Sequence, residues 1–167
     1  MRNAIIVGAG PNGLTAAARL AREGWDITVY EARPTIGGGS RTAELIEPGV
    51  LHDVCAAVHP SGAASAAFAA LHLEQHGLQW LHPEIPLVHP IDGDRAVALH
   101  RSLDATVAQM PAADGRRWRR LVQPLLDRFG AVNAFTQGPL LAWPDDPVAA
   151  AMFGVRGLWP ASLLRRA

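Results

Sequence analysis

Three glycines near the start of the chain have the spacing that a phosphate-binding turn requires. Gly8, Gly10 and Gly13 form the pattern G-x-G-x-x-G directly after residues 4–7, a short apolar run typical of a buried parallel strand. In such a turn the first glycine permits a tight bend, the second lets backbone approach a pyrophosphate, and the third lets the next helix pack closely on the strand. The free N–H groups of that helix N-terminus favour an anion. The pattern therefore predicts a dinucleotide-binding turn.

An acidic residue follows at the distance expected for a ribose ligand. Residues 26–30 alternate as a strand with Ile27 and Val29 directed inward, and Glu31 ends this strand 18 residues after Gly13. A carboxylate about 20 residues beyond the glycine turn accepts hydrogen bonds from ribose hydroxyls. It would repel a 2′-phosphate, which argues against NADP and leaves NAD and FAD open. The alternative interpretation is a Rossmann-type unit whose glycines serve only packing.

The segment after Glu31 favours FAD through a family resemblance. Residues 31–42 read EARPTIGGGSRT, and this run resembles the second fingerprint of the flavoprotein group that includes amine oxidases and phytoene desaturases. The glycine triplet followed by Arg41 and Thr42 is most similar to the phytoene desaturase branch. Glycines allow backbone to pass close to a cofactor, and Arg41 can bind an anionic pyrophosphate or help hold the flavin side. Without the family, GGGS would indicate a flexible linker.

The resemblance implies FAD as the cofactor, with hydride or electron transfer from an apolar substrate to the flavin. Residues 44–62 are similar to the stretch that passes the isoalloxazine ring in this group, so residues 53–59 would lie near the flavin. The resemblance identifies no catalytic residue. The residues predicted to bind the cofactor are Gly8, Ala9, Gly10, Pro11, Asn12, Gly13, Glu31, Ala32, Arg33, Gly38, Gly39, Ser40, Arg41 and Thr42.

The predicted fold class is α/β: a Rossmann-like, FAD-binding βαβ unit in residues 1–62, followed by part of an α+β substrate domain in residues 63–167. Two parallel strands and one helix cannot bury both faces of a doubly wound sheet, and members of the resembled family are much longer. We therefore expect an incomplete fold with uncovered apolar side chains. Such a chain by itself is expected to retain FAD weakly, to aggregate and to turn over no substrate. The strand side chains expected to be uncovered include Ile5, Val7, Ile27 and Val29.

The remaining segments predict short strands and amphipathic helices. We expect a strand at residues 43–46 before a turn at 47–49, a helix at 61–73, and a hairpin at 86–101 that turns at Asp92 and Gly93. Ser102 is expected to cap a helix that runs to residue 110, and Asp146 one that runs through residue 153. We also expect a loop at residues 139–147 and a short helix after Pro160. Residues 114–129 predict an amphipathic helix kinked at Pro124, whose apolar face holds Trp118, Leu121, Val122, Leu125 and Phe129.

Composition excludes several classes of function. The formal net charge is +0, so the overall field favours neither nucleic acid nor anionic membrane. All 15 basic residues are arginine, which excludes a P-loop lysine and a Schiff-base lysine. The lone Cys55 excludes an internal disulfide and fits a reducing cytoplasm. We expect no secretory signal at the start of the chain. No apolar run reaches about 18 residues, so we also expect no spanning helix, while peripheral membrane contact stays open.

Two groups of histidines have metal-like spacing. His72 and His76 are four residues apart, as zinc ligands on a helix can be, but the run HLEQH lacks the glutamate placement of H-E-x-x-H and has no evident third ligand. His52, Cys55 and His59 lie in the stretch that the flavoprotein resemblance already accounts for. We therefore expect exposed helix histidines and no metal.

The cluster RRWRR at residues 116–120 could indicate nucleic-acid binding. Within an amphipathic helix it indicates instead a solvated face with one core tryptophan. The predicted partner is a small apolar molecule, and the oligomeric state is left open. Two alternatives to a flavoenzyme remain: an NAD-dependent dehydrogenase, and a non-catalytic, truncated nucleotide-binding remnant.

Overall fold

The computed structural model describes residues 2–139, 141–160 and 162. The chain forms two compact units, Met1–Trp80 and Leu81–Ala167. The predicted boundary between a cofactor domain and a substrate domain, at residues 62 and 63, lies inside the first unit. That boundary stays a prediction, because a division into compact units does not say which residues bind cofactor or substrate.

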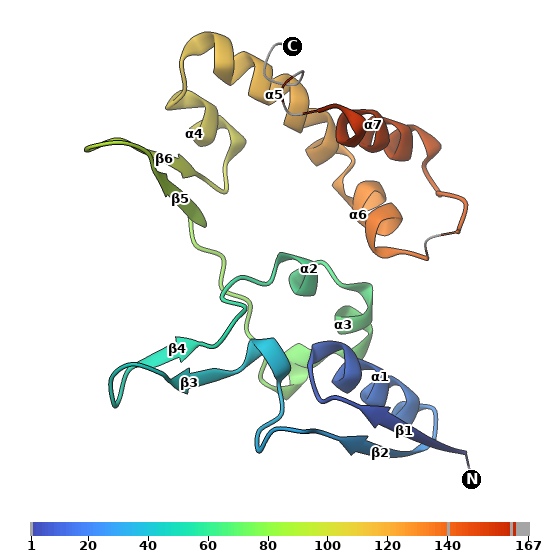
Figure 1. Cartoon of the computed structure of the whole chain (residues 1–167). Helices are drawn as coiled ribbons and strands as arrows, with labels where there is room; N and C mark the ends of the chain where they lie inside the picture. Colours follow the sequence, from blue (N-terminus) through green and yellow to red (C-terminus); the bar gives the residue numbers. More distant parts are fainter. Residues whose placement is uncertain (1, 140, 161, 163–167) are drawn as a thin grey trace. The chain divides into compact units, whose positions relative to one another are not determined.

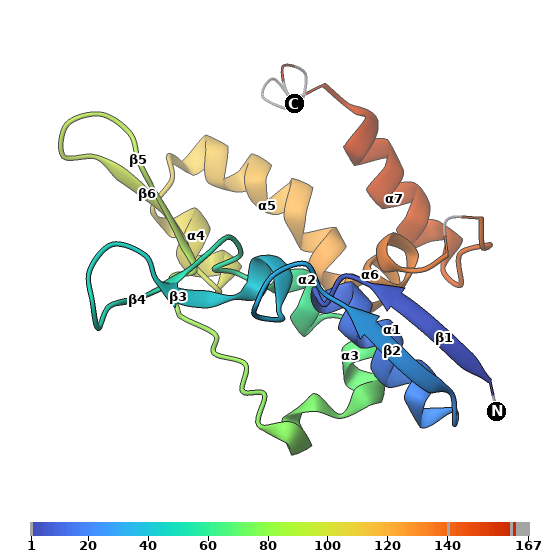
Figure 2. The same cartoon turned by 60° about the horizontal axis from the view of Figure 1, so that its bottom comes forward.

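The first unit begins with the predicted strand, helix and strand. They are β1 (Asn3–Val7), α1 (Pro11–Arg22) and β2 (Asp26–Tyr30). The two strands are parallel, with a register that runs from Asn3 opposite Asp26 to Val7 opposite Tyr30, and α1 lies along one face of the pair (Figure 1 and Figure 2). Together with the mixed helices and small sheets that follow, this arrangement confirms the predicted α/β, Rossmann-like fold class.

Alternation along the two strands decides which apolar side chains α1 covers. Ile6, Ile27 and Val29 are half-buried, and Ile6 lies only 3.4 Å from the place where a Cβ on Gly13 of α1 would stand. Ile5 and Val7 point to the other face and are 69% and 86% exposed. The prediction of uncovered side chains is therefore confirmed for Ile5 and Val7. It is wrong for Ile27 and Val29, because the pleat directs them toward α1.

A second small sheet follows the glycine triplet. A short 3₁₀ helix, η1 (Gly38–Ser40), leads into β3 (Thr42–Glu44), which pairs antiparallel with β4 (Leu51–Asp53). The strand predicted at residues 43–46 is thus present but displaced by one to two residues. The predicted turn is also present, since Val50 donates to the Glu47 carbonyl at 3.2 Å. The sequence did not indicate β4.

The single helix predicted at residues 61–73 is wrong. The segment forms α2 (Pro60–Ala63), α3 (Ala66–Leu71) and the 3₁₀ helix η2 (Leu73–His76). Ser65 interrupts the run, because its Oγ accepts a hydrogen bond from the Phe68 N–H at 3.3 Å and so starts a new helix. His72 ends that helix with a left-handed backbone at φ 52°. Arg22 of α1 donates to the Ala70 carbonyl of α3 at 2.6 Å, which fastens the two helices together.

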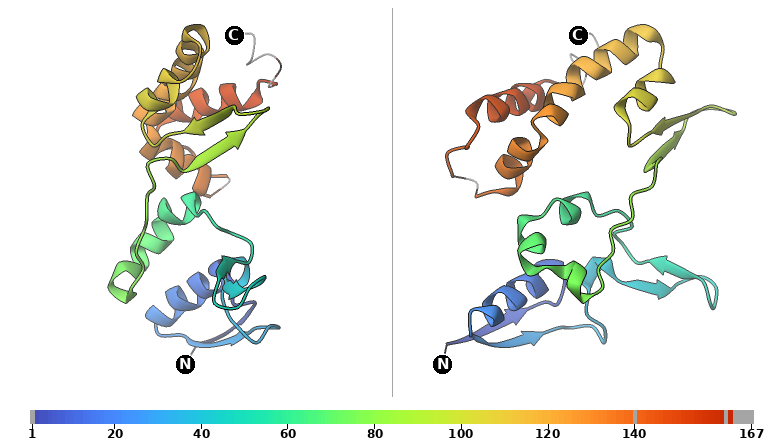
Figure 3. Two further views of the ribbon diagram at one scale, coloured as in Figure 1. Left: turned by 90° about the vertical axis from the view of Figure 1, so that its left-hand side faces the viewer. Right: turned by 180° about the vertical axis from the view of Figure 1, so that it is seen from behind.

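The second unit opens with the predicted hairpin. Its strands are β5 (Leu87–Pro90) and β6 (Ala96–Leu99), and Arg95 donates to the Asp92 carbonyl at 3.2 Å across the turn. Figure 3 shows the two strands side by side in both views. The helix α4 (Leu103–Ala108) then begins at the predicted cap, where Ser102 Oγ accepts from the Ala105 N–H at 3.2 Å.

The last three helices are α5 (Ala112–Asp127), α6 (Phe129–Gln137) and α7 (Pro147–Leu158). The predicted helix 114–129 ends at Asp127, and Phe129 begins α6 instead. Pro124 lies inside α5. The predicted core residues Trp118 and Phe129 are 37% and 55% exposed, so their assignment to the core is wrong. Leu121, Val122 and Leu125 are half-buried, as their positions on the apolar face predict.

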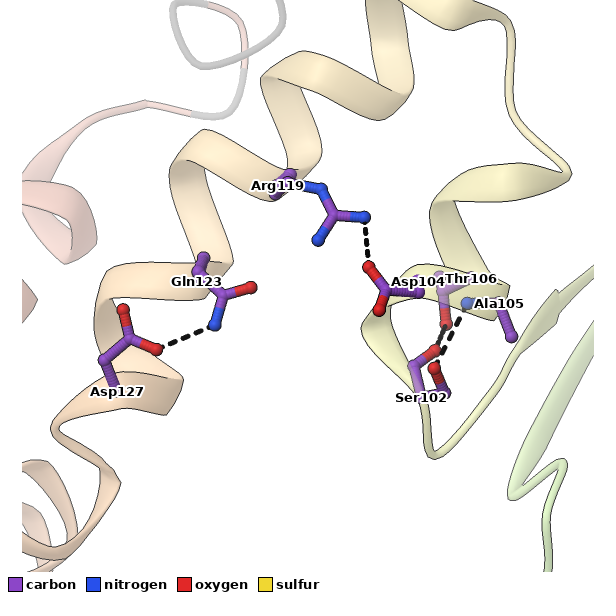
Figure 4. A network of polar contacts seen from close by, with 7 residues as sticks. All are labelled: Ser102, Asp104, Ala105, Thr106, Arg119, Gln123 and Asp127. Atoms are coloured by element: carbon purple, nitrogen blue, oxygen red, sulfur yellow. Dashed lines mark hydrogen bonds and ion pairs between the residues drawn. The ribbon is translucent and has the colours of Figure 1, made fainter.

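Polar contacts position the starts of these helices. Asp146 Oδ1 accepts from the Ala149 N–H at 2.9 Å and caps α7, as predicted, although α7 runs five residues beyond the predicted end at 153. In Figure 4, Arg119 of α5 reaches Asp104 of α4. The short helix expected after Pro160 falls mostly outside the described residues.

Candidate functional site

The first glycine turn depends on the backbone conformation of Gly8 and on the close approach of Gly13 to it. Gly8 has a left-handed backbone at φ 97°, and its N–H donates to the Tyr30 carbonyl at 2.7 Å, which ties the end of β1 to the end of β2. A Cβ on Gly13 would lie 2.0 Å from the Gly8 carbonyl oxygen. The helix can therefore begin directly against the turn only because both positions are glycine.

The N-terminus of α1 has free donors at this turn. Gly10 is the N-cap residue, with no side-chain cap, and Pro11 at the first helical position brings no N–H. Leu14 bonds to the Gly10 carbonyl at 2.9 Å and is the first N–H of the helix ladder. The N–H groups of Asn12 and Gly13 precede that ladder, so helix geometry gives them no intrahelical acceptor. They are suited to an anion placed over the turn.

Glu31 reaches back to the same turn. Its Oε2 accepts from the N–H of the buried Ala9 at 2.8 Å, and its Oε1 accepts from the Arg33 N–H at 2.9 Å. The hydrogen bond from the Ala9 N–H is the largest cause of the lowered pKa of the Glu31 carboxyl, and the hydrogen bond from the Arg33 N–H lowers this pKa further. The carboxylate is therefore ionised at neutral pH. Each of its oxygens keeps a further lone-pair direction for another donor.

The second glycine loop packs directly on the first turn. Gly37 donates to the Ala9 carbonyl at 2.8 Å. Gly38 has φ 57°, and a Cβ there would lie 2.9 Å from the Cα of Gly10. Two segments almost thirty residues apart thus meet backbone to backbone, at a distance that only glycine permits.

Arg41 and Thr42 are engaged within the protein. Arg41 donates from Nε to the Gly38 carbonyl at 2.8 Å and from Nη1 to Thr35 Oγ1 at 3.4 Å. Thr42 Oγ1 donates to Asp53 Oδ1 at 3.0 Å, in the β3–β4 pair. Cys55 lies beside the loop, with its Sγ 3.6 Å from the place of a Cβ on Gly39.

The predicted cofactor residues therefore gather in one place with few exceptions. Hydrogen bonds and close approaches join the first turn to Glu31 and to the loop at Gly37 and Gly38, which Arg41 contacts, whereas Thr42 is directed to Asp53. That these residues bind a cofactor stays a prediction. Gly37 and Thr35 also hold the second loop. Gly37 belongs to the glycine triplet that the sequence singled out, although it is not among the predicted cofactor residues, whereas nothing in the sequence indicates Thr35.

No group of three His, Cys, Asp or Glu side chains that could hold a metal is found among the described residues. His72 and His76 are both exposed, as expected, but they do not share a helix, because α3 ends at Leu71 and His76 belongs to η2. Within residues 2–139, 141–160 and 162, none of the helices has both the length and the apolar character needed to cross a bilayer.

Comparison with known proteins agrees with this geometry. Residues 6–72 match the family described as "NAD(P)-binding Rossmann-like domain". The pyridine nucleotide-disulfide oxidoreductase domain-containing protein 2 of Rattus norvegicus is 40% identical over 84 residues, which are 50% of this chain and 14% of the relative. A limonene dehydrogenase polypeptide of Castellaniella defragrans is 29% identical over 120 residues, which are 70% of this chain and 22% of the relative.

A third relative matches a shorter stretch. The lysine-specific histone demethylase 1 homolog 3 of Arabidopsis thaliana is 54% identical over 37 residues, or 22% of this chain and 2% of the relative. The matches to these three relatives thus cover between 2% and 22% of each relative's length. Their names are those of oxidoreductases. The chain contains a dinucleotide-binding, FAD/NAD(P) oxidoreductase-like region with relatives in the amine-oxidase and FAD oxidoreductase group.

Proposed function

We propose that this chain is the FAD-binding region of a flavin-dependent oxidoreductase that resembles phytoene desaturases. The observation that carries the proposal is the meeting of three features at one point. Glu31 accepts from the Ala9 N–H of the first glycine turn, and Gly38 of the second glycine loop packs against Gly10 of the same turn. An acid for ribose, a turn for pyrophosphate and a second glycine loop therefore face one another.

The residues fit a dinucleotide by their chemistry. The N–H groups of Asn12 and Gly13 would donate to the pyrophosphate at the uncapped start of α1. The free lone pairs of Glu31 would accept from ribose hydroxyls while its other contacts hold it against the turn. When bound, FAD would supply the redox chemistry by accepting a hydride or electrons from an apolar substrate.

FAD is preferred to a nicotinamide cofactor because of the second glycine loop. A single βαβ unit with its acid serves NAD and FAD equally well. The added loop, Gly37–Arg41, brings a further stretch of exposed backbone to the pyrophosphate side of the turn. An NAD-dependent dehydrogenase is the alternative that a binding experiment must exclude.

The rest of the proposal concerns domains and location. Residues 1–62 would form the cofactor part, and residues 63–167 would contribute to a substrate domain for a small apolar molecule. The second unit exposes large apolar side chains such as Leu141 and Trp143, which fits a region that faces an apolar substrate or further protein. The free Cys55 fits a reducing, cytoplasmic location.

The test is an equilibrium titration of the chain with FAD, and separately with NAD, each followed by isothermal titration calorimetry. Glu31→Ala should weaken FAD binding by roughly 10- to 100-fold, because it removes charge-assisted hydrogen bonds to ribose. Glu44→Ala is the matched control, since Glu44 is exposed in β3. NAD binding that is much tighter than FAD binding would refute the assignment, as would unchanged FAD affinity in a folded Glu31→Ala chain.

A pair of substitutions at Gly10 tests the pyrophosphate turn in the same assay. A Cβ on Gly10 would meet only the Gly38 Cα, at an ordinary 3.8 Å. Gly10→Ala should therefore fold and lose little FAD affinity. Gly10→Val adds two methyl groups in the space assigned to pyrophosphate and should lose more affinity than Glu31→Ala. Equal FAD affinity in both variants would place the pyrophosphate elsewhere.

A further inference from the structure

The second glycine loop has one backbone bond of its own, from the Ser40 N–H to the Gly37 carbonyl at 3.0 Å, and the Ala56 N–H donates to its Gly39 carbonyl at 2.9 Å. Gly37 and Gly38 both lie in the left-handed region, at φ 111° and φ 57°. Glycine loses more conformational freedom on folding than any other residue, and the loop contains three glycines in succession. A defined loop conformation therefore needs specific contacts from outside the glycines.

Arg41 supplies such contacts on three sides of the loop. Its Nε donates to the Gly38 carbonyl at 2.8 Å, and its Nη1 donates to Thr35 Oγ1 at 3.4 Å, so the guanidinium joins the middle glycine of the loop to Thr35, two residues before the loop. Its aliphatic stem lies against Gly37, where a Cβ would come within 3.0 Å of Arg41 Cγ. The backbone of Arg41 is itself anchored, because its carbonyl accepts from the Val54 N–H at 2.8 Å.

The loop that Arg41 holds forms one wall of the candidate site. Gly37 donates to the Ala9 carbonyl at 2.8 Å, and Gly38 lies against Gly10. A change in the Arg41 contacts therefore moves backbone that touches both Ala9 and Gly10 of the first turn. Since Glu31 bonds to the N–H of the same Ala9, the ribose and pyrophosphate sides of the site depend on one loop.

We infer that Arg41 is a positioning residue: it clamps the second glycine loop against the first turn and sets the width of the dinucleotide site before any cofactor binds. In this role the Nε–H and Nη1–H donors of the guanidinium matter, and its positive charge is secondary. The clamp rests on the contacts above, whereas its consequence for cofactor binding rests on the proposed function.

Replacing Arg41 by lysine separates a positioning role, which needs the guanidinium donors, from a direct contact with phosphate, which needs the positive charge. Lysine keeps the charge and lacks the Nε donor. The first experiment measures hydrogen exchange of the Gly37 amide by NMR in the whole chain without ligand. Arg41→Lys and Arg41→Ala should both speed this exchange about three- to tenfold, since loosening the loop exposes the bond from Gly37 to Ala9. Thr35→Val should have a smaller effect in the same direction, and Thr35→Ser should restore the wild-type rate.

Arg19→Lys is the matched control for this experiment. Arg19 also donates from Nε, to Glu23 Oε1 at 3.1 Å, but this pair is exposed on α1 and apart from the glycine loops. Its replacement should leave Gly37 exchange unchanged. Wild-type exchange at Gly37 in both Arg41 variants would overturn the inference.

The second experiment titrates the chain with ADP at two salt concentrations. A positioning role predicts that Arg41→Lys loses about as much ADP affinity as Arg41→Ala, with the wild-type salt dependence kept by both. A direct phosphate contact predicts the opposite: Lys retains most of the affinity, and Ala flattens the salt dependence, which would overturn the inference. If the wild-type chain binds neither ADP nor FAD, the proposed function fails, while the Gly37 exchange rates still decide the clamp.

Discussion

In the first unit, the backbones of two glycine loops meet through their glycines, whereas in the second unit side chains cap the helices and join them. Gly13 lies on Gly8, and Gly38 lies on Gly10, in contacts that a Cβ would break. In the second unit Ser102 and Asp146 cap helices, and Arg156 of α7 donates to the Leu121 carbonyl of α5 at 3.2 Å. Its glycines at 130, 154 and 157 have open space where a Cβ would stand.

The difference shows what each kind of contact is suited to. A backbone-to-backbone approach leaves the N–H groups at the start of a helix free for a ligand, which a nucleotide site requires. Side-chain caps use such N–H groups to orient the helices instead. Replacing glycine by alanine should therefore destabilise the first unit at its packed glycines, and should be neutral or favourable at most glycines in helices of the second unit.

The largest effect is expected for Gly13→Ala. The new Cβ would lie 2.0 Å from the Gly8 carbonyl oxygen, so α1 must move away from β1. We expect a loss of about 2–4 kcal/mol in the stability of the first unit, seen as faster hydrogen exchange in β1, α1 and β2. Exchange in α5 to α7 serves as the internal control, and wild-type protection of β1 would contradict the expectation.

Gly115→Ala tests a glycine of the second unit that is closely packed, as Gly13 and Gly38 are in the first unit. Gly115 is buried in α5, and a Cβ would lie 2.9 Å from the Val107 carbonyl oxygen of α4. The substitution should destabilise the α4–α5 pair by about 1–3 kcal/mol. Amide hydrogen exchange in α4 and α5 at increasing urea concentrations measures it, and the urea concentration at which protection is lost is the midpoint compared. An unchanged midpoint would mean that α4 can shift freely on α5.

Ser102→Ala should have a moderate effect confined to the second unit. It removes the Oγ that accepts from the Ala105 N–H at the start of α4. Loss of such a cap costs about 1 kcal/mol, measured as a lower urea midpoint. Ser102→Asn, which can still cap, should restore most of the loss, and equal losses in both variants would assign the effect to something other than capping.

Gly130→Ala should stabilise the second unit by about 0.5–1 kcal/mol, because alanine favours the helix and nothing lies within 4 Å of its Cβ. Thermal unfolding should shift upward by a few degrees. Gly154→Ala in α7 is a second position of the same kind. A destabilised protein in both cases would show that glycine matters in the second unit as well, and the comparison would fail.

Acid should lower the stability of both units through the carboxyls of Glu31 and Asp146. This effect should be the smallest of those predicted, because both carboxyls lie near the surface. The Ala9 N–H lowers the pKa of Glu31 from 4.5, and the Ala149 N–H lowers the pKa of Asp146 from 3.8. A pKa depressed by folding contributes stability above the unfolded value that is lost as pH falls through the folded value. Unfolding midpoints should therefore begin to fall near pH 4.5 and continue below 3.8, and Glu31→Gln should flatten the first part of this fall.

The sequence by itself determined the elements that depend on neighbouring residues. The glycine spacing, the alternation at Ile27 and Val29 and the acid at Glu31 predicted β1, α1 and β2 and the residues at their shared end. The caps at Ser102 and Asp146 were predicted for the same reason, since a cap bonds to an N–H three residues away. Such patterns express local geometry and can be recognised without the rest of the fold.

Tertiary structure decided the features that join distant segments. The pairing of β4 with β3, the exposure of Trp118 and the contact of Gly38 with Gly10 all depend on what packs opposite each residue. The sequence indicated that Arg41 could bind a pyrophosphate or help hold the flavin side, which stays a prediction, and only the fold shows its guanidinium bonded to Gly38 and Thr35. A residue type limits which bonds a side chain can make, but only the folded chain decides which acceptors come within its reach.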